Sequence, residues 1–408
     1  MHNSSEKKKS PPTIKKASSA VFWFLRVIFR PALYLLYRHK FEMKTSQGIR
    51  RPCLILANHQ TVFDQFAVGL GFKFGINYVA NEDIFRHGLL SRMMVFLSQP
   101  IAFSKGTSDF LAVKNMVTVV KDGGCVGMFP SGNRSFFGME STIVPGIGKL
   151  AKKLNVPLVL VQVRGGFNTL ARWKAKPSLG KMRAAVSRVV SPQEMAAMTS
   201  AGLDDIIQRE LRFNEFEYNK TARIAYRGRR RAEYLESALF WCPQCDSMSG
   251  LYSRGNDFCC ECGARVMINE TGFFERVDRA GNIPDTILEW SRLQLDYIKS
   301  FDYSGYADKP VFSDDNIAFS RAERAAGEHL LGTGTMALYD NRMVVCGQEF
   351  LFAETTMAVF GVRKMTIYNR GSIYSVLAPF RTNLVKYMIC GYHVRNTILG
   401  VKDEYYGY

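Results

Sequence analysis

Several features that mark common functional classes are missing from this chain of 408 residues. It has no Gly-x-Ser-x-Gly segment, so a covalent serine mechanism built on that turn has no support. It also has no glycine loop ending in Gly-Lys-Ser/Thr, which argues against a nucleotide phosphate loop. No small-residue cleavage site follows the N-terminal apolar stretch. We therefore expect no secretory signal, and reduced cysteines in a cytosolic compartment.

Acidic residues are scarce relative to basic ones. The chain has 36 Asp and Glu against 54 Lys and Arg, and a formal net charge of +18. Such an excess favours an anionic partner, either a lipid surface or nucleic acid. The length and the 47% hydrophobic content suffice for two or three domains. Residues 1–20 are rich in lysine and serine, which predicts a disordered basic tail.

Residues 21–40 are apolar and aromatic but contain Arg26, Arg30 and Pro31. The two arginines share one helical face, and the proline should kink or restart the helix. A membrane-spanning helix needs about 20 apolar residues, and each central arginine costs roughly 2.5–3.5 kcal/mol on insertion. We therefore expect a membrane-interfacial helix with its arginines at the headgroups. The alternative is a helix packed on the protein core, with arginines that reach out to solvent.

Residues 41–235 alternate short apolar runs with helix-like stretches. This alternation predicts an α/β domain whose sheet is mainly parallel and flanked by helices. The predicted strands are 53–57, 78–80, 101–103, 125–129 and 157–163, and the clearest predicted helices are 64–72 and 108–121.

A histidine and an aspartate follow the first predicted strand in the segment Asn58-His59-Gln60-Thr61-Val62-Phe63-Asp64. Because the predicted strand ends just before this motif, the His59 side chain can face a cleft. If Thr61 caps the next helix, Asp64 lies in the first turn and can fix the tautomer that makes His59 a general base. The alternative is that Thr61 and Asp64 form only a capping pair, and that His59 is an ordinary loop residue.

A second motif, Phe129-Pro130-Ser131-Gly132-Asn133-Arg134-Ser135, follows the strand predicted at 125–129. Gly132 permits a tight turn, and Arg134 can bind a phosphate in a bidentate way. Two further strand ends carry related features: Lys105 follows 101–103, and the run Val156-Pro157-Leu158-Val159-Leu160-Val161 leads to Arg164-Gly165-Gly166. Transfer of an acyl group to a hydroxyl needs a base near that hydroxyl and donors near the developing oxyanion.

Taken in their order along the chain, the four strand-end motifs resemble those of the lysophospholipid acyltransferase family, of the 1-acylglycerol-3-phosphate acyltransferase type. The family pattern is Asn-His-x-x-x-x-Asp, a Phe-Ile-x-Arg-like block, Phe-Pro-Glu-Gly-Thr-Arg-Ser and Val-Pro-Ile-Val-Pro-Val. The resemblance covers roughly residues 40–235. It implies a glycerolphosphate acyltransferase-like mixed sheet flanked by helices, in which His59 is the general base and Asp64 its partner. It also implies that Lys105, Gly132 and Arg134 form the phosphate-binding side.

Two residues depart from the family pattern. Ser131 stands where the family usually has glutamate, and Asn133 where it usually has threonine. The arginine is present, so phosphate binding is retained, but the missing carboxylate leaves the acceptor and the catalytic rate open. A catalytically impaired lipid-binding homologue is therefore an alternative. The bacterial members that carry a zinc module after the catalytic domain resemble this chain most.

A cysteine module lies in residues 236–275. Two Cys-x-x-Cys pairs, Cys242 with Cys245 and Cys259 with Cys262, supply four thiolates, a set typical of a structural tetrahedral zinc. Four thiolates leave no open position for catalysis. The alternative is a pair of disulfides, which a reducing compartment disfavours. Cys260 could compete as a ligand.

Residues 276–408 predict one amphipathic helix at 285–300, followed by a small mainly-β domain that could be a barrel or a sandwich. Asn369-Arg370-Gly371 predicts a hairpin turn there. A basic run before the zinc module, Arg223 to Arg231, supports another alternative, a zinc-ribbon protein that binds nucleic acid. That alternative leaves the four acyltransferase motifs unexplained.

The sequence therefore predicts a peripheral acyltransferase on the cytoplasmic face of the cell membrane. Its expected substrates are a lysophospholipid, most simply 1-acylglycerol 3-phosphate, and an acyl thioester of coenzyme A or acyl carrier protein. Its expected partner is an anionic membrane surface, and its expected cofactor is a structural zinc. No nucleic-acid partner is expected.

Overall fold

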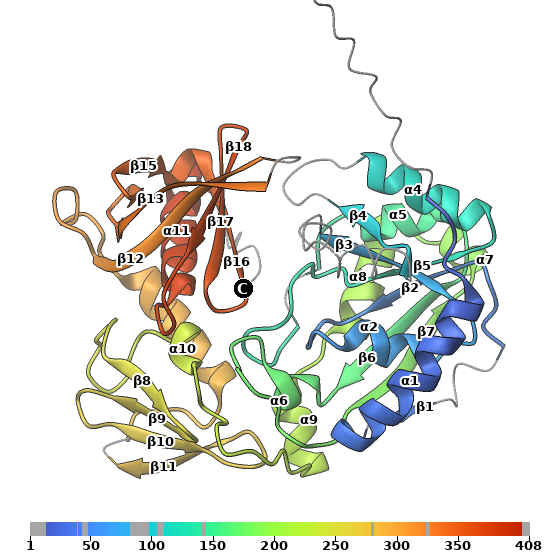
Figure 1. Ribbon diagram of the computed structural model, residues 1–408, viewed down its shortest axis with the longest axis horizontal. Coiled ribbons are helices and arrows are strands. Elements are labelled where there is room, and N and C mark those ends of the chain that lie inside the picture. Colours follow the sequence, from blue (N-terminus) through green and yellow to red (C-terminus); the bar gives the residue numbers. More distant parts are fainter. Residues whose placement is uncertain are drawn as a thin grey trace, which may run out of the picture.

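A computed structural model describes residues 14–38, 40–42, 48–81, 98–103, 110–140, 143–278, 281–323 and 327–401. The strands form three sheets of seven, four and seven strands. Figure 1 shows the first sheet and its helices on one side of the molecule, with the two later sheets beside it.

The first sheet has the order β1-β7-β6-β2-β5-β3-β4. Its pairs are parallel except β6 with β7, which is antiparallel, so the sheet is mixed. Its strands are β1 (Lys40–Glu42), β2 (Cys53–Ala57), β3 (Ile76–Asn81), β4 (Ile101–Phe103), β5 (Cys125–Met128), β6 (Leu158–Arg164) and β7 (Arg183–Val190). The five strands predicted from the sequence are all present, and β1 and β7 were not predicted.

Strand β2 shows why both faces of this sheet are covered. Leu54 and Leu56 contribute to the core under α4, α5, α7 and α8, whereas Cys53, Ile55 and Ala57 contribute to the core under α1 and α2. Successive strand residues point to opposite faces, so a strand buried on both sides is an uninterrupted apolar run. The helices of this domain are α1 (Ser19–Tyr37), α2 (Asp64–Gly69), α4 (Phe110–Lys121), α5 (Ile147–Leu154), α6 (Gly166–Leu170), α7 (Pro192–Ala196), α8 (Ser200–Leu211) and α9 (Glu215–Ala222).

The N-terminal segment departs from the expected disordered tail. Residues 14–18 have no regular secondary structure, but the buried Ala17 donates its N–H to Asn77 Oδ1 at 2.8 Å. The tail prediction is therefore wrong for these residues, while residues 1–13 lie outside the described part. Ser18 caps α1, which continues through Pro31 as one helix, so the predicted restart does not occur.

Helix α1 has one face on the protein and one face in solvent. Phe22 and Leu33 are buried in the sheet core, and Arg26 donates to the carbonyl of Phe72. Arg26 therefore contacts the protein and does not project toward headgroups, which fits the core-packed alternative for this face. The outer face is apolar, with the side chains of Trp23, Phe24, Val27, Ile28 and Leu35 exposed. Among the described residues, no helix is both long and apolar enough to cross a bilayer.

The second sheet is antiparallel, in the order β11-β10-β9-β8. It follows the short 3₁₀ helix η3 (Leu235–Ser237) and the first cysteine pair. The strands are β8 (Leu251–Arg254), β9 (Asp257–Cys260), β10 (Arg265–Ile268) and β11 (Phe274–Asp278). The last strand continues past residue 275, where the zinc module was expected to end.

The third sheet is antiparallel in the order β15-β14-β13-β12-β18-β17-β16. Helix α11 (Leu384–Leu399) packs against this sheet and next to α10 (Ile287–Ser300), so the domain is neither a barrel nor a sandwich (Figure 1). The predicted hairpin turn is confirmed, because Arg370 and Gly371 both have positive φ between the paired Asn369 and Ser372. The elements are β12 (Phe312–Glu323), β13 (Gly327–Leu338), β14 (Arg342–Val345), β15 (Gln348–Leu351), η4 (Phe352–Glu354), β16 (Thr355–Phe360), β17 (Lys364–Asn369) and β18 (Ser372–Leu377).

One continuous core joins the later sheets to the first domain. Phe167 and Trp173 follow β6 and belong to the same buried cluster as Phe258 of β9, Trp290 of α10 and Met357 of β16. The described residues therefore form three sheets, and the two later sheets share a core with residues of the first domain.

Candidate active site

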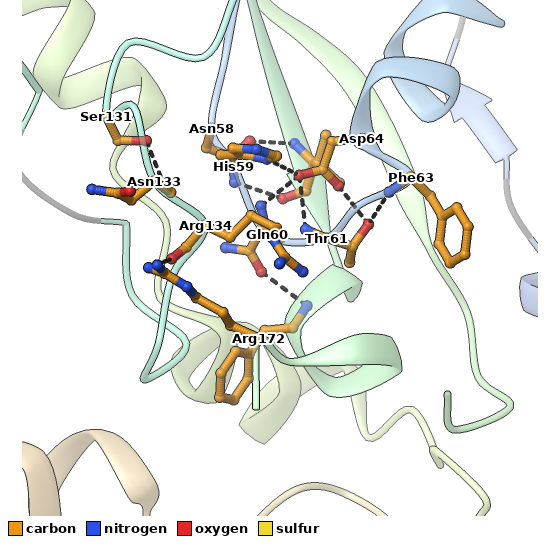
Figure 2. A network of polar contacts seen from close by, with 12 residues as sticks. Asn58, His59, Gln60, Thr61, Phe63, Asp64, Ser131, Asn133, Arg134 and Arg172 are labelled. Carbon is orange, nitrogen blue, oxygen red and sulfur yellow. Dashed lines mark hydrogen bonds and ion pairs between the residues drawn. The ribbon is translucent and has the colours of Figure 1, made fainter. Parts of the chain in front are cut away.

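His59 and Asp64 form a hydrogen-bonded pair between the end of β2 and the start of α2. His59 Nδ1 lies 2.8 Å from Asp64 Oδ2 (Figure 2). Because an ionised carboxylate only accepts, Nδ1 carries the proton and Nε2 is the basic nitrogen. The His59 side chain is 19% exposed and its ring stacks on Phe129, with centroids 4.3 Å apart. The arrangement suits general-base chemistry.

Asp64 also organises the loop that carries the histidine. Its Oδ2 accepts the N–H groups of Gln60 and Thr61 at 2.5 and 2.9 Å, and its Oδ1 accepts the Thr61 hydroxyl at 3.0 Å. The residue at the N-cap position of α2 is Phe63, so the expectation that Thr61 caps this helix is wrong. Thr61 Oγ1 accepts the Phe63 N–H instead. Asp64 thus orients His59 and closes the turn.

Hydrogen bonds from the end of β6 fix the loop that carries His59. The Asn58 amide pairs with the backbone of Val163 in both directions, at 2.8 and 2.6 Å. Gln60 Oε1 accepts the Phe167 N–H at 3.1 Å. A Cβ on Gly166 would lie 2.8 Å from the Gln60 Cβ, so only glycine permits this approach. Residues 163–167 therefore hold the loop that carries His59 in place.

The second motif lies against the first. Gly132 has a φ of +67°, a value that favours glycine, and its N–H donates to the Phe129 carbonyl at 2.9 Å. The predicted tight turn is confirmed. Ser135 donates its N–H to the His59 carbonyl at 2.9 Å, and Arg134 is half-buried beside the pair. Burial lowers the pKa of Arg134, and the charge of Asp64 acts in the opposite direction.

Lys105, predicted on the phosphate-binding side, lies outside the described residues. Strand β4 ends at Phe103, two positions before it. Its role stays a prediction.

Glu140 belongs to this site and was not predicted. Its carboxylate is 5% exposed and accepts the His59 N–H at 3.0 and 3.2 Å. Burial raises its pKa to about 8, while hydrogen bonds from Ser131 and the His59 amide favour the charged form. A carboxylate thus lies beside Ser131, where the family pattern has its glutamate. No sequence signal marks Glu140, because it stands nine positions after Ser131 and belongs to no recognisable motif.

Arg172 is a second buried cation that the sequence analysis missed. It is 7% exposed, its Nη1 donates to the Arg134 carbonyl at 3.4 Å, and it lies beside Arg134 in Figure 2. Its guanidinium carbon lies 3.9 Å from the centroid of Phe136. Burial, and then the charge of Arg134, lower its pKa to about 9. No sequence motif marks this residue.

The site borders a cavity of about 890 Å³, within the range of roughly 300–1,000 Å³ typical of ligand sites. His59, Arg134 and Arg172 lie on its wall. The rest of the wall is mainly apolar and comes from α1, α2, the β4–α4 region and α5, including Phe22, Phe29, Phe66, Phe103, Met116 and Leu150. The site therefore joins an apolar chamber to a cationic end with a base.

The sequence of residues 39–164 matches the profile of the family described as Acyltransferase. This part of the chain is an acyltransferase domain. It contains His59, Asp64, Gly132 and Arg134, so the expected acyltransferase resemblance is confirmed, while the 1-acylglycerol-3-phosphate type and the roles of these residues stay predictions.

Among solved structures, about half of this chain is similar to the 1-acyl-sn-glycerophosphate (LPA) acyltransferase PlsC from Thermotoga maritima. That alignment has 18% sequence identity and a TM-score of 0.41, and covers 47% of this chain and 76% of that chain. No curated protein matches the sequence significantly.

After the acyltransferase domain, the structure groups Cys242, Cys245, Cys260 and Cys262, whose Sγ atoms all lie within 4.8 Å of one another. The expected ligand Cys259 is not in this group. Successive strand residues point to opposite faces: Cys260 is buried, whereas Cys259 lies opposite Tyr252 of β8. A tetrahedral zinc with Zn–S bonds of about 2.3 Å separates its sulfurs by about 3.8 Å. The Sγ distances Cys242–Cys262 and Cys245–Cys260, 4.0 and 3.7 Å, fit that geometry.

Proposed function

We propose that the protein transfers an acyl chain from a thioester donor to the free hydroxyl of a lysophospholipid, 1-acylglycerol 3-phosphate, in phospholipid synthesis. The observation that carries this proposal is the position of the His59–Asp64 pair at the cationic end of an apolar cavity. An acceptor of this kind has the same two parts, an acyl chain and a phosphate.

The reaction follows from the tautomer of His59. Nε2 takes the proton from the acceptor hydroxyl while that oxygen attacks the thioester carbonyl carbon. The tetrahedral intermediate then expels the thiolate, which receives the proton from the imidazolium, so an ester forms and a thiol leaves. Asp64 stabilises the transient imidazolium. Arg134 binds the acceptor phosphate, with Lys105 assigned to the same role by family resemblance. The donor is a thioester of coenzyme A or acyl carrier protein.

Membrane association is part of the proposal. The outer face of α1 exposes a stripe of large apolar side chains, with Trp23 65% and Leu35 76% exposed. Such a stripe fits insertion into the interface of an anionic membrane, supported by the net charge of +18. The inner face of α1 lines the cavity with Phe22 and Phe29, so lipid has a short route to the site. We assign the protein to the cytoplasmic face of the membrane as a peripheral enzyme.

The two alternatives fit the structure less well. Loss of the glutamate at Ser131 suggested an impaired homologue, but Glu140 supplies a carboxylate beside that serine. The basic run suggested nucleic-acid binding. Its arginines at positions 223, 227, 229 and 230 are exposed, whereas Arg231 is buried and donates to the carbonyls of Ile268 and Gly228. Arg231 therefore ties the cysteine module to the preceding loop, and nucleic-acid binding leaves the His59–Asp64 pair at the cavity unexplained. We assign the four clustered cysteines to a structural zinc.

A transfer assay tests the proposal. The purified protein is incubated with 1-acylglycerol 3-phosphate in mixed micelles and an isotope-labelled acyl thioester of coenzyme A or acyl carrier protein. Labelled diacylglycerol 3-phosphate, with release of one thiol per ester, is the expected result. Thiol release without ester formation, or no reaction with either donor, contradicts the proposal.

A further inference from the structure

We infer that the C-terminal β domain completes the acceptor site, with Arg172 acting beside Arg134 as a second phosphate-binding cation that β16 holds in place. The inference rests on the proposed acyl transfer, and it assigns a role to a domain outside the residues that match the family.

Arg172 links the two parts of the chain. It lies just after α6 in the acyltransferase part, yet one Nη2 N–H donates to the carbonyl of Val359 in β16. The same guanidinium also donates to the Arg134 carbonyl and lies over the face of Phe136. The guanidinium has five N–H donors, and two carbonyl contacts leave donors for an anion. Arg172 also lines the cavity, so those donors border the ligand space.

The charges near Arg172 favour an anionic ligand. Within the described part of the chain, no carboxylate forms an ion pair with Arg172 or Arg134, although the charge of Asp64 favours the charged form of Arg134. Both cations are desolvated, and the charge of Arg134 disfavours the charged form of Arg172. Holding a carbonyl oxygen does not require a charge, so an interdomain tie alone does not account for a second cation at this point. A phosphate dianion between the two guanidinium groups would offset both the desolvation and the repulsion.

The end of β16 forms part of the cavity wall. Phe360 and Gly361 line the cavity together with His59 and Arg134. The strand end therefore both holds Arg172, through Val359, and limits the space next to the phosphate end. The β domain thus acts on acceptor recognition, while the base and its partner lie wholly in the acyltransferase domain.

The test compares Arg172→Gln and Arg172→Lys with a matched control, Arg363→Gln. Arg363 has the same kinds of contact, a carbonyl at Ala378 and an aromatic face at Phe380, but does not line the cavity. We expect Arg172→Gln to raise the KM for 1-acylglycerol 3-phosphate roughly 10- to 100-fold, a typical loss for one charge-assisted contact. The KM for the acyl donor should stay within about twofold, Arg172→Lys should recover part of the loss, and Arg363→Gln should resemble wild type.

A structural role alone would give a different pattern, with kcat and both KM values of Arg172→Gln impaired together and no recovery by Arg172→Lys. That pattern, or an unchanged acceptor KM, overturns the inference. If the wild type transfers no acyl group, the proposed function fails, and calorimetric titration with sn-glycerol 3-phosphate still tests the cation pair. Binding by the wild type that is at least tenfold weaker in Arg172→Gln supports the pair, and equal or undetectable binding in both overturns it.

Discussion

The Glu140 carboxylate accepts the backbone N–H of His59 at 3.0 and 3.2 Å, although 81 residues separate the two in sequence. Two carboxylates therefore fix the histidine: Asp64 holds its ring, and Glu140 holds its backbone. Ser131 lies at the same carboxylate. Ser131, one of the two residues that depart from the family pattern, is therefore next to a buried carboxylate.

We predict that Glu140→Ala lowers kcat by roughly 10- to 100-fold, since loss of this contact lets the His59 backbone move and small displacements of a base are costly. Ser131→Glu alone should also impair the enzyme, because it adds a second carboxylate to a buried one. The double variant Ser131→Glu/Glu140→Ala should recover a substantial part of the lost rate. Steady-state kinetics of the three variants measure this, and wild-type turnover in Glu140→Ala would refute the assignment.

The raised pKa of Glu140 predicts a pH dependence of stability. Between its ordinary pKa of 4.5 and the folded value of about 8, the folded protein keeps a proton that the unfolded chain releases. The contribution of Glu140 to stability therefore falls as pH rises through that window. Glu140→Gln cannot titrate, so the stability of wild type relative to this variant should decline from pH 5 to pH 8. Chemical unfolding at several pH values measures this difference in stability. The titration of all other groups is common to both proteins and therefore cancels. A constant difference would contradict the assigned shift.

The cysteine cluster predicts about one zinc per chain with a specific ligand set. Cys260→Ser should lose the metal, or bind it roughly tenfold or more weakly, because one of four thiolates is removed. Its neighbour substitution Cys259→Ser is the matched control and should retain zinc, since Cys259 is not in the cluster. Metal analysis of proteins expressed with zinc distinguishes the two. Retention by Cys260→Ser with loss from Cys259→Ser would reverse the assignment.

The outer face of α1 predicts the membrane contact. Trp23→Ser and Ile28→Ser should each weaken binding to anionic vesicles roughly tenfold, because burying a large apolar side chain is worth about 1.5–3 kcal/mol. Leu331→Ser, at an exposed apolar position of β13, is the control. Point variants are preferable to deletion of α1, since Phe22 and Leu33 belong to the sheet core. Vesicle sedimentation that shows the larger loss for Leu331→Ser would move the contact to the C-terminal domain.

The sequence predicted the parts of the fold in which local pattern and burial agree. The bounds of strands β2 and β4 were predicted to the residue, because each is a short apolar run between polar stretches of the sequence. Helix α11 was missed because it is buried nearly all round, so it lacks the polar face that marks a helix in sequence. Strand β7 was missed because it contains the polar residues Arg183, Ser187 and Arg188, which lie at exposed or half-buried positions and interrupt its apolar run.

The same distinction between local sequence pattern and tertiary packing separates the residues of the candidate site. His59, Asp64, Gly132 and Arg134 stand in motifs whose spacing is local, so the sequence contained their relationship. Glu140 and Arg172 reach the site only through tertiary packing, and no spacing relates them to it. The choice of Cys260 over Cys259 depends on which face of β9 each side chain occupies, which two adjacent cysteines do not reveal.

The most direct test of the central claim is the rate of acyl transfer by His59→Ala compared with wild type and with Asp64→Asn. General-base catalysis contributes about 10²–10⁴-fold. The account predicts that His59→Ala loses at least 100-fold in kcat while it still binds the acceptor, and that Asp64→Asn loses less because the base remains. Circular dichroism and thermal unfolding verify that the variants are folded. Turnover of folded His59→Ala within a few-fold of wild type would contradict the proposed mechanism.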